Sequence, residues 1–203
     1  MALRGVGQRR GTPADLLVLG LGNPGAQYVS TRHNIGVEVV EELARRGGAS
    51  LKPSKERALV AEVTLAGKRM ALAFPQTFMN LSGESAQLLV KRFGISEPHQ
   101  IVVVHDELDL EPGVLKVKSG GGLAGHNGLK SLKQHLHTDA FLRVRIGVGK
   151  PTNAQQGADH VLRKISKADR ELLSVMVQRA ADAVECIAEL GVDTAMNRFN
   201  QAI

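Results

Sequence analysis

The chain has 203 residues, 43% of them hydrophobic, and a formal net charge of +6 at pH 7. This length suits one sizeable core and thus a single domain, and no segment is apolar and long enough to be predicted to span a membrane. The only cysteine, Cys186, excludes an intramolecular disulfide and a cysteine-based metal site, which predicts a reducing, cytoplasmic location.

The chain begins with a segment that we expect to be a disordered basic tail, residues 1–14, before a single folded domain at 15–203. The tail has three arginines but no apolar run, so it lacks the hydrophobic stretch of a secretory signal.

A short apolar run then predicts a buried strand at 16–20. A helix follows and ends at Gly47. Its apolar stripe is formed by Ile35, Val39 and Leu43.

Glycines at the end of the first strand, in the pattern Gly20-x-Gly22-x-x-Gly25, formally match the dinucleotide-binding fingerprint. An NAD-dependent enzyme is therefore one alternative. Pro24 counts against it because it removes a backbone donor from the loop that would hold the pyrophosphate. Asn23 is the more informative residue. Its amide could hydrogen-bond a substrate at the strand terminus, although Asn before Pro-Gly also suits a plain turn.

The rest of the chain alternates strands and helices, which favours an α/β fold. Strands are predicted at 57–66, 68–74, 101–104, 115–119 and 141–148. A second helix is predicted from Leu81, Leu88 and Leu89, and a third at 126–136. A long last helix begins at Ser166, where Asp169 completes a capping-box pattern. The apolar stripe of this last helix comprises Leu172, Met176, Ala180, Ala183 and Ile187.

His33 lies where the chain enters its first helix, in a stretch too polar for the core. A lone histidine is usually a surface or capping residue, but a carboxylate that holds its second ring nitrogen in one tautomer makes it a candidate general base. Asp106, at the end of a predicted buried strand, is the best partner if the two strands are parallel neighbours. Glu107 and Asp109 could instead join His105 and Asp106 as ligands of a metallohydrolase. Their position before a turn suggests that they are solvated.

Covalent nucleophiles find little support in the sequence. No Gly-x-Ser-x-Gly elbow occurs, and Cys186 falls within the apolar stripe of the last helix. Direct attack by water remains, which suffices for an ester if a base and a carbonyl-polarising donor are in place. Asn80 and Asn127 are candidate donors, although each also stands where a helix cap is expected.

The positive charge is local, because residues 114–150 contain seven basic residues against a single aspartate. Lys116 and Lys118 share one face of a predicted strand, as do Arg143 and Arg145, and a solvated face would normally mix charge signs. We therefore expect this segment to contact nucleic-acid phosphates, and a noncatalytic RNA binder is an alternative to an enzyme. Aromatic residues make up only 3% of the chain, so stacking on bases is not expected.

Six motifs, in order, resemble those of bacterial-type peptidyl-tRNA hydrolases. They are GLGNPG at 20–25, Tyr28 with TRHN at 31–34, Pro75 with TFMN at 77–80, HDELDL at 105–110, GHNGL at 125–129 and RVRIG at 143–147. The resemblance implies a single catalytic domain, a three-layer α/β sandwich with a mixed twisted sheet flanked by helices. It further implies a monomer that uses no metal or cofactor and needs no membrane or obligate protein partner.

The resemblance also implies an activity, hydrolysis of the ester between the peptide C-terminus and the 3′-terminal ribose of tRNA, which rescues tRNA from prematurely released peptides. His33 resembles the general base, Asp106 the carboxylate that orients it, and Asn23 a substrate-positioning residue. Residues similar to the substrate-binding positions are Tyr28, Met79, Asn80 and Asn127. Residues expected to hold phosphates of the tRNA acceptor arm are Lys116, Lys118 and Arg145. Ala124 departs from the family's usual glycine, and the basic tail extends beyond the family's usual start; neither removes any of these residues.

Overall fold

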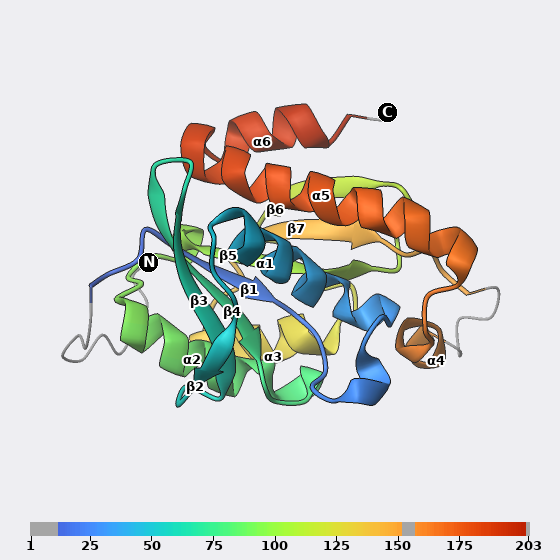
Figure 1. Cartoon of the computed structure of the whole chain (residues 1–203), viewed down its shortest axis with the longest axis horizontal. Helices are drawn as coiled ribbons and strands as arrows, with labels where there is room; N and C mark the ends of the chain where they lie inside the picture. The colour runs from blue at the N-terminus through green and yellow to red at the C-terminus, as the bar shows by residue number, and fades with distance from the viewer. Residues whose placement is uncertain (1–11, 152–156, 202–203) are drawn as a thin grey trace.

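A computed structural model describes residues 12–151 and 157–201 of the chain. They form a seven-stranded sheet in the order β2-β3-β4-β1-β5-β7-β6, with helices on both faces (Figure 1). The strands are β1 (Leu16–Gly20), β2 (Lys52–Ser54), β3 (Ala58–Leu65), β4 (Lys68–Pro75), β5 (Ile101–Glu107), β6 (Leu115–Ser119) and β7 (Leu142–Gly147). The α-helices of the described residues are α1 (Ile35–Arg46), α2 (Ser82–Phe93), α3 (Asn127–Leu136), α4 (Gly157–Leu162), α5 (Lys167–Leu190) and α6 (Val192–Phe199).

The central strands of the sheet are parallel. β1 pairs in parallel with β4 and β5, and β5 pairs in parallel with β7. The outer strands β2, β3 and β6 join through antiparallel pairs, so the sheet is mixed, as the family resemblance implies. Because β1 and β5 run side by side in the same direction, the residues that follow their C-terminal ends lie next to each other.

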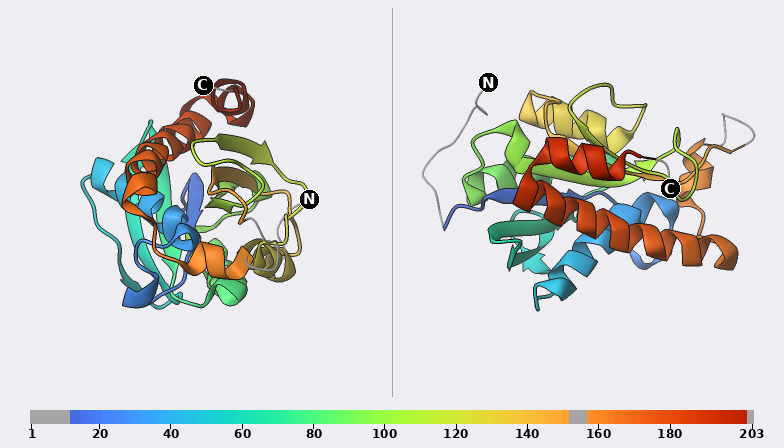
Figure 2. Two further views of the ribbon diagram at one scale, coloured as in Figure 1. Left: turned by 90° about the vertical axis from the view of Figure 1, so that its right-hand side faces the viewer. Right: turned by 90° about the horizontal axis from the view of Figure 1, so that it is seen from above.

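Two hydrophobic cores lie on the two faces of the sheet. α1, α5 and α6 cover one face, and α2 and α3 cover the other, which confirms a three-layer sandwich (Figure 2). In β1, Leu16 and Val18 point into the first core, whereas Leu17 and Leu19 point into the second. This burial on both faces explains the uninterrupted apolar run of β1. In the described parts of the chain, no helix is long and apolar enough to cross a membrane.

Leu172, which we assigned to the apolar stripe of α5, and Leu88, one of the leucines from which α2 was predicted, are in fact exposed. Leu88 in α2 is 42% exposed and Leu172 in α5 is 41% exposed. Leu88 and Leu89 are consecutive and therefore about 100° apart around the helix, so they cannot share one narrow face. α2 buries Leu89 together with Ala86 and Phe93.

Element boundaries also differ from the predictions. β5 does not end at residue 104 but continues through Glu107, because β7 pairs with it from Val102 to Glu107. Neither α4 nor α6 was predicted. Ala14 is buried and its N–H donates to the Phe93 carbonyl at 3.0 Å, so the ordered chain begins before residue 15. Residues 1–11 of the expected tail lie outside the described residues, and their disorder stays a prediction.

Candidate active site

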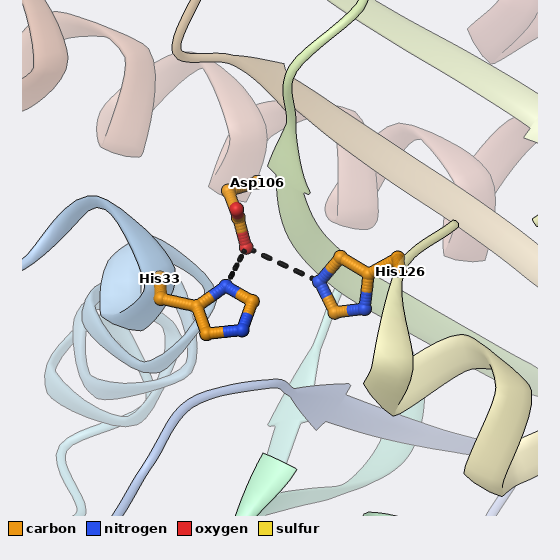
Figure 3. A group of neighbouring side chains, drawn as sticks. All are labelled: His33, Asp106 and His126. Carbon is orange, nitrogen blue, oxygen red and sulfur yellow. Dashed lines mark hydrogen bonds and ion pairs between the residues drawn. The ribbon is translucent and has the colours of Figure 1, made fainter. Parts of the chain in front are cut away.

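The site forms where the chain leaves β1 and β5. His33 belongs to a short 3-10 helix (Arg32–Asn34) after β1, and Asp106 lies near the end of β5. His33 Nδ1 and Asp106 Oδ1 are 2.9 Å apart (Figure 3). The expected contact between these two residues is therefore present, and the parallel pairing of β1 with β5 is what brings them together.

A second histidine, which the sequence analysis did not single out, also contacts Asp106. His126 Nε2 lies 3.2 Å from Asp106 Oδ1, so the carboxylate stands between two imidazoles (Figure 3). His126 is also the N-cap of α3, where its Nδ1 accepts from the backbone N–H groups of Gly128 and Leu129 at 3.1 and 3.4 Å. Because Nδ1 accepts, Nε2 carries the proton and donates to Asp106.

The electrostatics of the site follow from this arrangement. Burial opposes protonation of His33, but the charge of Asp106 and the hydrogen bond to it outweigh burial and raise the pKa of His33 above its ordinary value. Burial alone would raise the pKa of Asp106, yet the two histidines hold it well below its usual range. Asp106 is therefore a carboxylate, and it can hold His33 in the tautomer with the proton on Nδ1.

His105 lies beside this group but in a different state. It is completely buried, and its Nδ1–H donates to the backbone carbonyl of Asp106 at 2.7 Å. Burial, followed by the neighbouring His126, lowers the pKa of His105 to about 3, so it stays neutral. His105 therefore belongs to the core.

Asn23 is held by three hydrogen bonds at the end of β1. Its backbone N–H and carbonyl both bind the Asn34 side chain at 2.9 Å, and its Oδ1 accepts from the Met79 N–H at 2.8 Å. These contacts fix the orientation of the Asn23 amide and leave its Nδ2 group as the donor available to a ligand. Asn34, which fixes Asn23, is a further site residue that sequence analysis did not identify.

The residues converge on a cavity of about 550 Å³. One part of its lining is polar and consists of Asn23, His33, Asn80, Asp106, Glu107, His126 and Asn127. Another part is apolar and consists of Phe78, Met79, Leu108, Val161 and Leu162. The N-caps of α2 and α3 are Leu81 and His126, so neither Asn80 nor Asn127 serves as a cap. Tyr28 is not part of this lining, contrary to its expected place in the pocket.

Neither interpretation of Glu107 from the sequence, as a metal ligand or as a solvated residue, fits the structure. Glu107 is 3% exposed and its Oε2 binds Arg145 Nε at 3.0 Å, so it is neither solvated nor directed to a metal. His33, Asp106 and His126 do cluster, but His126 Nδ1 already accepts two N–H groups, so Nε2 keeps its proton and cannot ligate a cation.

Gly20, the last residue of β1, serves packing rather than dinucleotide binding. A Cβ on Gly20 would lie 2.3 Å from the Gly36 carbonyl oxygen, so this glycine allows α1 to approach the strand. α1 begins only at Ile35, well after Gly25, whereas the dinucleotide fingerprint requires a helix that opens directly at the glycines. The NAD-dependent alternative therefore lacks its structural context.

The basic segment at 114–150 is more internally paired than its sequence suggested. Arg143 is 1% exposed and its guanidinium donates to the Gly120 and Gly122 carbonyls. Lys116 Nζ donates to the Asn200 carbonyl. Three others form ion pairs, namely Arg145 with Glu107, Lys133 with Asp139 and Lys150 with Asp109. Arg143 is thus a structural residue and not part of a phosphate-binding face.

Two substitutions of His126 are expected to separate its role as the N-cap of α3 from its contact with Asp106. His126→Ala should lower the free energy of unfolding by about 1 kcal/mol through loss of the α3 N-cap. His126→Asn keeps a good capping side chain and should restore most of that stability. Both variants should lower kcat about ten-fold, the scale of one hydrogen bond to a charged group. Urea denaturation and turnover assays measure the two effects, and full activity in His126→Asn would contradict a role for the Asp106 contact.

The fold and the site define an α/β protein with a histidine–carboxylate pair in a cavity lined by amide donors. The family model described as "Peptidyl-tRNA hydrolase" matches residues 17–203. The chain therefore belongs to the peptidyl-tRNA hydrolase family.

Individual relatives agree with the family match. A peptidyl-tRNA hydrolase of Renibacterium salmoninarum is 47% identical over 189 residues, which cover 92% of this chain and 97% of that protein. A peptidyl-tRNA hydrolase of Frankia alni is 46% identical over 184 residues, covering 91% and 93%. The crystal structure of peptidyl-tRNA hydrolase from Acinetobacter baumannii superimposes with a TM-score of 0.86 at 37% identity, covering 94% of this chain and 97% of that one.

Proposed function

We propose that this protein hydrolyses the ester bond between the C-terminus of a peptide and the 3′-terminal ribose of tRNA. The observation that carries the proposal is the 2.9 Å contact between His33 and Asp106 in a cavity of about 550 Å³. Membership of the peptidyl-tRNA hydrolase family supports the identity of the substrate. Products are free tRNA and free peptide, and the cellular role is to recover tRNA from prematurely released peptides in the cytoplasm.

Water is the nucleophile in the proposed mechanism. Asp106 accepts the Nδ1–H of His33, which leaves Nε2 to take a proton from water. The water oxygen forms a bond to the ester carbonyl carbon, and the developing oxyanion is stabilised by amide donors. The C–O bond to the ribose then breaks, and the proton on His33 passes to the leaving oxygen. The proton taken from water thus ends on the leaving oxygen, and the proposed mechanism uses no metal or cofactor.

The asparagines supply the donors for this reaction. The Met79 N–H donates to Asn23 Oδ1 and so fixes the orientation of the Asn23 side-chain amide. Asn23 Nδ2 is therefore held in one position, which suits a donor to the reacting carbonyl. Asn80 and Asn127 lie in the same cavity and are exposed to it, where they suit the peptide backbone. The apolar lining around Met79 suits the side chain of the last peptide residue. Tyr28 does not line this cavity, so its expected role in substrate binding has no such structural support.

Phosphates of the acceptor arm are assigned to Lys118 and Arg145. Lys116, Lys118, Arg143 and Arg145 share one face of the sheet, because β6 pairs with β7 in the register Lys116↔Arg145 and Lys118↔Arg143. Of these, Lys118 is partly exposed. Arg145 binds Glu107 through Nε, and among the described residues no hydrogen-bond acceptor is recorded for its two terminal guanidinium nitrogens. We further propose that the protein acts as a monomer, without an obligate protein partner.

A turnover assay on N-acetylated aminoacyl-tRNA tests this function. The expected result is release of the N-acetyl amino acid and intact tRNA, at a rate that a chelator does not change. Aminoacyl-tRNA without the N-acetyl group is the control, since its free ammonium cannot mimic a peptide bond in an amide-lined pocket. Binding of tRNA without turnover would support the noncatalytic RNA binder instead, and loss of turnover with the chelator would support a metallohydrolase.

A further inference from the structure

The outer edge of β6 is paired by the side chain of Asn200, the C-cap of α6. Within the described residues, β6 is the last strand of the sheet and pairs with a strand, β7, on one side only. On its other side, the Val117 N–H donates to Asn200 Oδ1 at 2.6 Å and Asn200 Nδ2 donates to the Val117 carbonyl at 2.9 Å. An amide side chain offers one acceptor and one donor, as a neighbouring strand would, so Asn200 completes the pairing of this edge.

Asn200 is itself fixed by the packing of α6. The helix lies beside β6 and α5 (Figure 1), and its Ala195 is completely buried in the core beneath it. Phe199, next to Asn200, packs against the same core, and the Arg179 guanidinium lies 5.8 Å from the centre of its ring. The backbone carbonyl of Asn200 also accepts from Lys116 Nζ. Asn200 therefore links α6 to β6 through both its side chain and its backbone.

Lys118 follows directly on the residue that Asn200 holds. Val117 points into the core under α5 and α6, so Lys118 emerges on the opposite face of the strand. The Lys118 amine lies against the turn at Gly121, where a Cβ would come within 2.8 Å of Nζ. Arg143 holds that turn through the Gly120 and Gly122 carbonyls. The position of Lys118 is therefore set by Asn200 on one side and by the Arg143-held turn on the other.

We propose that Asn200 is a positioning residue for tRNA: by pairing the edge of β6, it holds Lys118 where it meets a phosphate of the acceptor arm. Lys116, whose amine binds the Asn200 carbonyl, belongs to this link and not to the phosphate contact. This inference rests on the proposed function. It predicts that Asn200 affects recognition of the tRNA body and not the hydrolysis of the ester.

The experiment compares Asn200→Ala, Lys118→Ala and the double variant in steady-state turnover of N-acetylated aminoacyl-tRNA. Asn200→Ala should raise KM about five-fold, the scale of one lost phosphate contact, with kcat unchanged. It should also reduce the slope of log KM against log salt by roughly 0.7 to 0.9. Because Asn200 acts through Lys118, Asn200→Ala should add no further increase in KM when Lys118 is already alanine.

Controls separate this effect from a loss of structure. Asn197→Ala makes the same substitution at an exposed position of the same helix and should leave KM unchanged. An N-acetyl aminoacyl ester of adenosine, which lacks phosphates, should be hydrolysed equally by Asn200→Ala and the wild type. If Asn200→Ala does not fold, Asn200→Gln replaces it, because glutamine keeps the amide group but places it one methylene further out. Its effect on KM should likewise disappear when Lys118 is already alanine.

Three results obtained with Asn200→Ala would each overturn the inference. They are an unchanged KM in Asn200→Ala, an equal loss on the adenosine ester, and a further increase in KM in the Lys118→Ala background. If Lys118→Ala itself leaves KM unchanged, the proposed phosphate contact fails and the inference fails with it. If Lys118→Ala raises KM but Asn200→Ala does not, only the inference about Asn200 fails.

Discussion

Replacing His33 with alanine is expected to lower kcat on N-acetylated aminoacyl-tRNA by about 10²- to 10⁴-fold, the usual contribution of a general base. The reason is that Nε2 of His33 is the group left to accept a proton once Nδ1–H is bound to Asp106 at 2.9 Å. His33→Asn is the sharper variant, because its amide can still donate to Asp106 but cannot take a proton at neutral pH. Both variants should lose activity to the same extent.

Matched measurements make the His33 result interpretable. His99→Ala is the control, because His99 is exposed and lies just before the N-terminal end of β5, at the opposite end of that strand from Asp106. This variant should keep wild-type kcat. Circular dichroism should report a folded protein for all variants. Near-full activity in His33→Ala would show that another group activates water, and the proposed mechanism would be wrong.

Asp106→Asn is expected to lower kcat by roughly 10²-fold or more, because the asparagine amide no longer selects the productive tautomer of His33. It should also move the pH dependence. The charge of Asp106 raises the pKa of His33, and His33 is active only when neutral, so wild-type activity rises as pH increases through that raised pKa. Without the charge, burial acts unopposed and lowers the pKa of His33, and the acid limb of kcat/KM should shift to lower pH.

The control for Asp106→Asn is Asp109→Asn, which removes an exposed carboxylate three residues further along the chain. That variant should keep both the rate and the position of the acid limb. A pH profile of kcat/KM over the range in which histidine titrates decides the question. An acid limb that stays in place, or moves to higher pH, in Asp106→Asn would show that the limb reports some group other than His33.

The sequence by itself determined the architecture and the family. Alternating apolar segments and glycine stops are local signals, and they identified β1, α1, β3, β4 and β7 because each element needs only its own pattern of side chains. Motifs in a fixed order likewise placed His33, Asp106 and Asn23 among the candidate residues. Even the wrong assignment of Leu172 to a buried stripe concerned the face of a correctly predicted helix.

Only the tertiary structure decided which polar residues meet. The contact of His126 with Asp106 joins residues 20 positions apart and depends on where α3 begins relative to β5, which no local pattern encodes. The same holds for Glu107 and Arg143, which sequence patterns placed in solvent or on a phosphate-binding face. Strand pairing instead gives them partners across the sheet and in a glycine turn. Charge along a sequence thus indicated nucleic acid, but packing determined which cations remain available to bind it.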